Sequence, residues 1–141
     1  MVMINDAVTV VRTAVDAIND RSLGDRAAEL LDPSFVRHDL VELFSDSHGP
    51  AGASDFVSMI ISAMSDFHLA IADIFGAGDP AVAGLRMSGT HTGAPLLGQP
   101  AHGRRLSASA VFIYRATGGR LAEAWQLVDG LAFYRLAGLI D

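Results

Sequence analysis

The chain has 141 residues, half of them apolar, and a formal net charge of −6 at pH 7. This length and composition predict one domain over residues 1–141 with a single core, and they exclude a disordered acidic tail. The acidic balance argues against a nucleic-acid-binding protein, which would usually carry a basic face. Because cysteine is absent, the chain has no disulfide framework, no thiolate nucleophile and no cysteine-bound metal.

Targeting and cofactor signals are also missing from the sequence. No apolar run reaches the length of about 18 residues that a membrane-spanning helix needs. Residues 1–6 lack the basic segment that is typical of a signal peptide. His48, His68 and His102 show no metal-ligand spacing, and no phosphate-loop or dinucleotide motif occurs. We therefore expect a soluble cytoplasmic protein that binds a small molecule, with no metal, no cofactor, and neither nucleic acid nor membrane as a partner.

The first half of the chain has the spacing of helices. Apolar residues recur at steps of three and four along residues 4–18, which predicts an amphipathic helix. A second short helix is expected over residues 25–31. It ends at Asp32-Pro33, because proline disfavours helix in the residue before it. Residues 35–40 are expected to form a short strand or an extended entry into the core. Gly49-Pro50 then opens a third helix with an apolar stripe.

The second half changes to the period of two that is typical of strands. Residues 67–75, 81–92, 106–115 and 120–128 predict four strands separated by turns rich in glycine and proline. A terminal helical turn is expected over residues 130–136. Helices followed by an antiparallel meander predict an α+β fold, with the helices packed on one face of a curved sheet around a conical pocket.

Four short motifs follow one another in this half. They are Gly-Thr-His-Thr-Gly at 89–93, Gly-Gln-Pro-Ala-His-Gly-Arg at 98–104, Glu-Ala-Trp-Gln-Leu-Val-Asp at 123–129 and Leu-Ala-Gly at 136–138. In order and spacing the chain resembles the SnoaL-like polyketide cyclase family of the NTF2-like superfamily. The resemblance implies an NTF2-like cone, with a curved antiparallel sheet wrapped around three N-terminal helices. It also implies a homodimer formed through the outer face of the sheet.

The resemblance implies that one catalytic group is replaced here. In the aromatic polyketide cyclases of this family, an aspartate on the last strand is the acid and base of an intramolecular aldol closure. That position corresponds to Gln126, whose amide cannot exchange a proton near neutral pH. The neighbouring cavity positions, which are His or Gln in those cyclases, correspond to Ala110, Phe112 and Ala124. We therefore expect a pocket of the family's shape with fewer polar groups.

Strand alternation indicates which side chains share a face with Gln126 or with its neighbours. Leu85 and Met87 share one face of their strand with His91, and these apolar residues are expected substrate contacts together with Ala110, Phe112 and Ala124. Gln126 would orient a substrate carbonyl or a water, or be a buried amide satisfied by backbone. Trp125 would face away from the pocket if Gln126 faces into it, and would bind substrate if a bulge reverses the assignment.

Five residues are candidates for acid–base or other polar roles in the pocket, each with a structural alternative. His91, at the expected pocket rim, would move a proton or hydrogen-bond to the backbone. Asp129 would be a base in an apolar pocket or the N-cap of the terminal helix. His38 and Asp39 lie where NTF2-like enzymes often place a polar pair, and they would otherwise form a surface pair. Asp39 with Asp66 would activate a water if the chain resembles the related epoxide hydrolases.

Three functions are therefore considered. The first is an enzyme of polyketide or other secondary metabolism, including antibiotic biosynthesis, which cyclises or isomerises a bulky apolar substrate. In it, His91 would act with Asp129 or Asp39. The second is a non-catalytic binding module or an accessory subunit of a tailoring hydroxylase, and the third is an epoxide-hydrolase-like enzyme. A carboxylate and an imidazole converging in the pocket would favour catalysis, whereas a lining of apolar side chains alone would favour binding.

Overall fold

The computed structural model describes residues 7–76 and 79–141, and these ranges form four helices and a six-stranded sheet. In chain order the elements are α1 (Ala7–Asn19), α2 (Leu23–Leu30), β1 (Leu31–Asp39), β2 (Ser47–His48), α3 (Gly49–Ala63), β3 (His68–Gly76), β4 (Ala81–Thr90), β5 (Arg105–Thr117), β6 (Arg120–Val128) and α4 (Gly130–Leu136). The predicted helices and strands are thus confirmed to within a few residues at their ends. The expected first turn of the N-terminal helix, and residues 77–78 of the turn after β3, lie outside the described residues.

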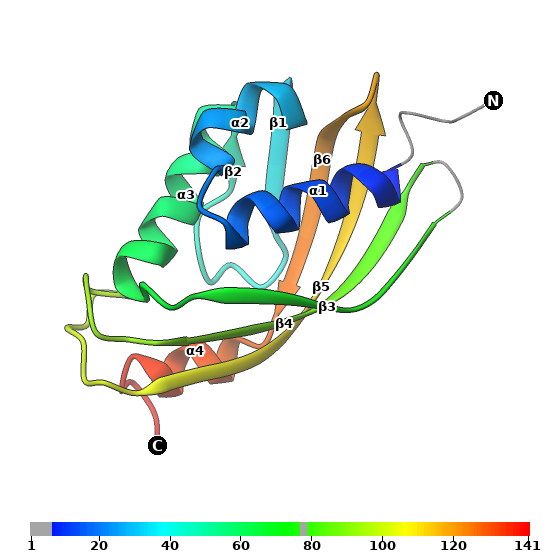
Figure 1. Ribbon diagram of the computed structural model, residues 1–141. Coiled ribbons are helices and arrows are strands. Elements are labelled where there is room, and N and C mark those ends of the chain that lie inside the picture. Colours follow the sequence, from blue (N-terminus) through cyan, green and yellow to red (C-terminus); the bar gives the residue numbers. More distant parts are fainter. Residues whose placement is uncertain (1–6, 77–78) are drawn as a thin grey trace.

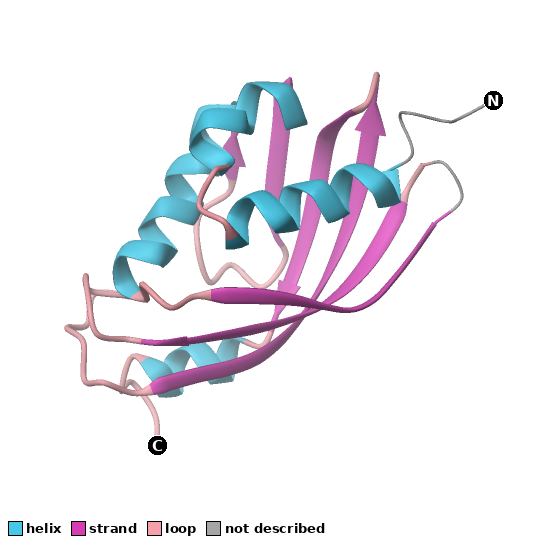
Figure 2. Ribbon diagram, viewed as in Figure 1, coloured by secondary structure: helices cyan, strands magenta, loops and turns pink. Residues whose placement is uncertain are grey.

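The sheet is curved and open, with the strand order β2-β1-β6-β5-β4-β3. Its pairs are antiparallel except for β1 and β6, which run parallel. Figure 1 shows α1, α2 and α3 on one side of this sheet and α4 at one end of it. The same two-layer arrangement is visible in Figure 2, where the strands bend around the helices. The expected α+β cone is therefore confirmed.

The N-terminal strand is longer than the sequence pattern indicates. The expected extended segment 35–40 is part of the nine-residue β1, which begins directly after α2. This strand pairs with β6, so that Arg37 lies beside Ala124 and Asp39 beside Gln126. Such pairing joins segments far apart in the chain, and local periodicity carries no information about it.

The side of the sheet that faces the helices is the one that carries Gln126. On β6, Ala124, Gln126 and Val128 are buried, whereas Leu127 is exposed. The register of β5 and β6 shifts between Arg115 and Ala116, but the irregularity lies before Ala124 and leaves this assignment unchanged. Trp125 consequently faces away from the helices, and the alternative in which a bulge turned it inward is wrong.

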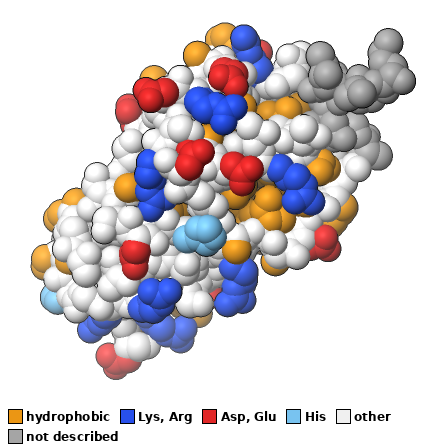
Figure 3. Space-filling view, in the orientation of Figure 1, with side chains coloured by type: hydrophobic (Ala, Val, Ile, Leu, Met, Phe, Trp, Pro, Cys, Tyr) orange, Lys and Arg blue, Asp and Glu red, His pale blue; other side chains and the backbone are white. Residues whose placement is uncertain are grey.

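The protein surface carries both charged and apolar side chains. On the face seen in Figure 3, acidic and basic side chains are interspersed with apolar patches. Among the helices in the described ranges, none is both long and apolar enough to cross a membrane.

Candidate functional site

A cavity of about 120 Å³ lies between α1–α3 and the inner face of the sheet. Its walls are mostly apolar and include six of the chain's seven phenylalanines: Phe35, Phe44, Phe56, Phe67, Phe112 and Phe133. An apolar cavity of about 150 Å³ is known to hold benzene, whereas sites for drug-sized ligands measure roughly 300–1,000 Å³. In this conformation the cavity therefore has room for about one ring of the bulky substrate that the sequence led us to expect.

One charged side chain, Arg37 of β1, lines this apolar cavity. It is only 5% exposed, and its guanidinium lies over the ring of Phe56, 3.8 Å from the ring centroid. Nε and Nη2 donate to Ser47 Oγ at 3.2 and 3.0 Å, and Nη2 also donates to the Ser45 carbonyl at 2.6 Å. Burial lowers the pKa of Arg37, while the nearby carboxylates of Asp39 and Asp46 oppose that shift. The cation is thus fixed in place by neutral partners.

Gln126 continues this polar wall from β6. Its side chain is 2% exposed, and Oε1 accepts a hydrogen bond from Nη1 of Arg37 at 3.1 Å. A guanidinium only donates, so the amide oxygen must face Arg37 and the NH₂ group must face elsewhere. Within the described residues, this NH₂ group makes no hydrogen bond. Gln126 lines the cavity and can therefore offer its NH₂ group to a ligand.

Tyr114 of β5 is the third polar group of the wall. Its ring stacks on Phe112 with centroids 5.6 Å apart, and its hydroxyl has no hydrogen-bond partner in residues 7–76 and 79–141. Burial raises the pKa of this hydroxyl well above its ordinary value of 10, against the opposing influence of Arg37. The hydroxyl is therefore protonated at neutral pH and can donate its hydrogen.

The strand register explains why these groups share one wall. Arg37 pairs with Ala124 and Ala124 with Tyr114, so the three residues form a row across β1, β6 and β5. Gln126 lies two residues further along β6, on the same face. Because Ala124 has a one-carbon side chain, it leaves space between its two long neighbours. The arrangement can bind an oxygen atom that accepts several hydrogen bonds.

Five of the expected substrate contacts line the cavity, namely Leu85, Met87, Phe112, Ala124 and Gln126. Ala110 is buried on the same face of β5 but is not among the residues that line the cavity.

His91 lies outside the cavity lining, with its side chain completely buried. Its Nε2 is 2.8 Å from the carbonyl oxygen of Ala94, which only accepts, so Nε2 carries the hydrogen. Nδ1 has no hydrogen-bond partner in the part of the chain that the structure describes. The backbone of His91 also forms two hydrogen bonds: its N–H donates to the carbonyl of Arg104, and its carbonyl accepts from the N–H of Gly103. These contacts correspond to the structural alternative for His91.

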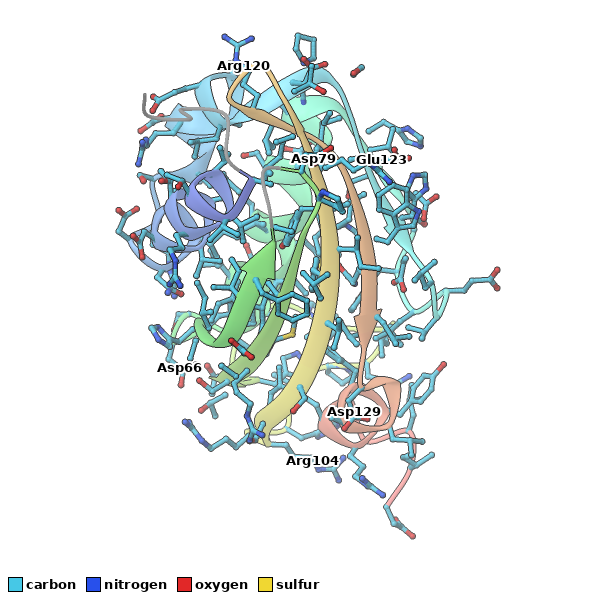
Figure 4. All side chains as sticks on the ribbon, turned by 90° about the vertical axis from the view of Figure 1, so that its right-hand side faces the viewer. Asp66, Asp79, Arg104, Arg120, Glu123 and Asp129 are labelled. Carbon is cyan, nitrogen blue, oxygen red and sulfur yellow. The ribbon has the colours of Figure 1, made fainter. Side chains whose placement is uncertain are left out.

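The two carboxylates expected to assist His91, those of Asp129 and Asp39, instead accept hydrogen bonds from backbone N–H groups. Asp129 Oδ1 accepts from Ala132 N at 3.2 Å and so caps α4, at the junction with β6 that Figure 4 shows. Asp39 accepts from the backbone N–H groups of Val41 and Phe44, at 3.1 and 2.7 Å. Neither residue lines the cavity.

The expected place of His38 and Trp125 in the pocket is corrected by the structure. On β1, Phe35, Arg37 and Asp39 are buried, so alternation turns His38 to the outer face. There its Nε2 lies 2.6 Å from Oε2 of Glu123, and its ring stacks on Trp125 with centroids 5.4 Å apart.

Asp66 also lies away from the cavity, near the β3 edge of the sheet in Figure 4. Its carboxylate accepts from the backbone N–H and the hydroxyl of Thr90, at 2.7 and 2.9 Å. Asp39 and Asp66 therefore do not meet in the pocket as the epoxide-hydrolase arrangement requires.

Sequence reasoning missed Arg37 and Tyr114. The signal for Arg37 was its position two residues after Phe35, in phase with an apolar face. Tyr114 lies two residues after Phe112, so strand alternation places both on one face, but an aromatic residue there is equally expected in a core.

Helices covering the concave face of an open sheet, with an apolar pocket between them, define an NTF2-like cone of the ketosteroid isomerase type. The family model described as SnoaL-like polyketide cyclase matches residues 8–135. The chain therefore belongs to the SnoaL-like polyketide cyclase family. A comparison with curated protein sequences found no significant match.

Solved structures of similar proteins support the fold. TsrD from Streptomyces laurentii is 26% identical over 94% of each chain, with a TM-score of 0.79. A SnoaL-like polyketide cyclase from Agrobacterium tumefaciens is 18% identical over 96% of this chain and 98% of its own, with a TM-score of 0.73. A protein with a ketosteroid isomerase-like fold from Catenulispora acidiphila, solved with trimethylamine, is 13% identical over 92% of each chain, with a TM-score of 0.72.

Proposed function

We propose that this chain catalyses a cofactor-independent cyclisation or isomerisation of an apolar, carbonyl-bearing molecule in polyketide or other secondary metabolism. Membership of the SnoaL-like polyketide cyclase family supports the reaction class. The observation that carries the proposal is the wall formed by Arg37, Gln126 and Tyr114, which offers hydrogen-bond donors inside an apolar cavity. Donors fixed in such a site stabilise the negative charge that develops on a substrate oxygen, and one donor can be worth about 10²- to 10³-fold in rate.

An intramolecular aldol closure illustrates the chemistry. The enol carbon of the substrate bonds to a second carbonyl carbon, and the π electrons of that carbonyl move to its oxygen. Tyr114 gives its hydroxyl proton to this oxygen, next to the cation of Arg37. The proton lost from the enol oxygen passes through water back to Tyr114, so that no atom is gained or lost overall.

The size of the cavity limits the substrate. About 120 Å³ accommodates the reacting ring, and a larger substrate would need its remaining rings outside this volume. The six phenylalanines suit the faces of an aromatic or ring-forming guest.

A binding module or accessory subunit is the second candidate function. It is supported by the absence of carboxylate and imidazole groups among the described residues that line the cavity. A pocket of this kind can hold a ligand even where it supplies no base.

The cyclisation of nonane-2,4,8-trione to 2-acetyl-3-methylcyclohex-2-enone, with loss of one water, tests the two functions. Its 1,3-dicarbonyl unit enolises without a protein base, its reacting part closes one ring, and the loss of the enol absorbance follows the reaction. The wild-type protein should accelerate this closure above the buffer rate. Tyr114→Phe, which keeps the ring and its stacking on Phe112, should lower the rate by about 10²-fold or more. Binding of the trione without any acceleration would exclude the catalytic proposal and favour the binding module.

We also propose a homodimer formed through the outer face of the sheet. Val111 and Leu127 pair across β5 and β6, and they are 44% and 49% exposed. Ile113, 39% exposed, pairs with Trp125 beside them. This contiguous apolar surface on a regular antiparallel pair supports self-association.

A further inference from the structure

Arg37 is a buried cation without a carboxylate in contact. Its four side-chain hydrogen bonds go to a hydroxyl, a backbone carbonyl and an amide oxygen, and all of these groups are neutral. Asp39 and Asp46 influence its charge from a distance, but neither forms an ion pair with it in the described part of the chain. Taking a cation out of water is unfavourable unless an opposite charge compensates it. An anion in the adjoining cavity would supply that charge.

The hydrogen-bond donors that remain unused on this wall also favour an anionic ligand. A guanidinium has five N–H groups, and the four hydrogen bonds of Arg37 leave one N–H of Nη1 free. The NH₂ group of Gln126 and the hydroxyl of Tyr114 add further donors on the same face. These groups match a ligand oxygen with several lone pairs and a negative charge.

The other cavity walls decide what kind of anion fits. They are apolar, with six phenylalanines among aliphatic side chains, so they offer no replacement for the water shell of a small inorganic anion. An oxyanion whose charge is delocalised into a ring or a conjugated chain loses less on leaving water, and its apolar body fills the space between the phenylalanines. The described lining also contains no base that could create the charge. The ligand must therefore be acidic enough to ionise by itself, as phenols and 1,3-dicarbonyl compounds are.

We infer that this pocket selects a one-ring, delocalised oxyanion, an enolate or phenolate, and binds its charged oxygen against Arg37 with help from Gln126 and Tyr114. The inference rests on the proposed function, because it names the substrate as a molecule that reacts through its enolate. It predicts that binding lowers the pKa of the ligand, since the anionic form is held more tightly than the neutral form.

The probe is 4-nitrophenol, which ionises near neutral pH and absorbs at a longer wavelength as the phenolate. The wild-type protein should bind the phenolate at least about tenfold more tightly than the neutral phenol, seen as growth of the phenolate band when protein is added at a pH below the pKa of the free probe. Arg37→Met should lose this preference, whereas Arg37→Lys, which retains the charge, should keep part of it.

A second measurement needs no variant and therefore does not depend on how the Arg37 variants fold. The wild-type protein should bind 4-nitrophenol at a pH where it is ionised about tenfold more tightly than 4-nitroanisole, a methyl ether of similar shape that cannot ionise. Equal affinity for the two compounds, a bound nitrophenol that stays neutral, or no binding of either compound would overturn the inference. Because this is an equilibrium measurement, its failure is distinguishable from a failure to cyclise nonane-2,4,8-trione.

Discussion

Replacing His91 by alanine is expected to weaken the fold while leaving the affinity of the pocket for 4-nitrophenol unchanged. The imidazole is fully buried and donates to the carbonyl of Ala94 at 2.8 Å, on a loop packed against the end of α3. Gly93 in this loop is held so close that a side chain there would collide with the backbone oxygen of Ser62. The loop therefore has little freedom to close the space that the missing ring would leave.

The expected loss in the free energy of unfolding follows from three contributions. The lost hydrogen bond is worth about 1 kcal/mol, and truncation of a buried aromatic ring to alanine costs about 3–5 kcal/mol. The variant also removes the unpaired Nδ1, whose burial costs the wild-type protein about 1–3 kcal/mol. We expect a net destabilisation of about 3 kcal/mol, the middle of a range of about 1–5 kcal/mol, which for a chain of this size lowers Tm by roughly 9–12 °C.

Urea unfolding followed by the fluorescence of Trp125, the single tryptophan of the chain, measures this change. His91→Gln is the matched control, because its amide can still donate toward Ala94 but does not titrate near neutral pH. We expect this variant to lose about 1 kcal/mol and to retain both nitrophenol binding and trione cyclisation. A well-folded His91→Gln variant that binds the probe but has lost all cyclisation would refute the structural role and restore His91 as an acid–base residue.

Three further predictions address the cavity, the surface carboxylates and the outer face. Ala124→Met places a longer side chain between Arg37 and Tyr114, so it should weaken nitrophenol binding at least about tenfold. Unchanged affinity in the folded variant would exclude this row as the ligand site. The backbone and side-chain hydrogen bonds from Thr90 hold the pKa of Asp66 below its ordinary value of 3.8, so the stability it contributes is present above pH 3.8 and is lost as the pH falls through the lower folded-state pKa. Asp66→Asn should therefore destabilise the protein more at pH 7 than at a pH below the folded-state pKa, and an equal difference in unfolding free energy at both would contradict this sign. Ile113→Glu should convert the proposed dimer to a monomer in sedimentation velocity, and a wild-type protein that already sediments as a monomer would rule out the dimer.

The amino-acid sequence was sufficient to predict the elements and the faces they share. Spacing of three and four residues identified the helices, and alternation placed Leu85 with Met87 and Ala124 with Gln126, because side-chain direction along a helix or strand is set by local geometry. Motif order predicted the family, and the family model bears it out.

The tertiary structure alone decided which polar groups meet. Parallel pairing of β1 with β6 brings Arg37 from the first third of the chain beside Ala124, and no local pattern specifies that pairing. Likewise, Asp129 and His91 carry the right chemistry in the sequence, but the structure directs them to backbone partners instead of the cavity. A side chain's residue type and its face are encoded locally, whereas its partners depend on contacts between segments far apart in the chain, and only folding creates those contacts.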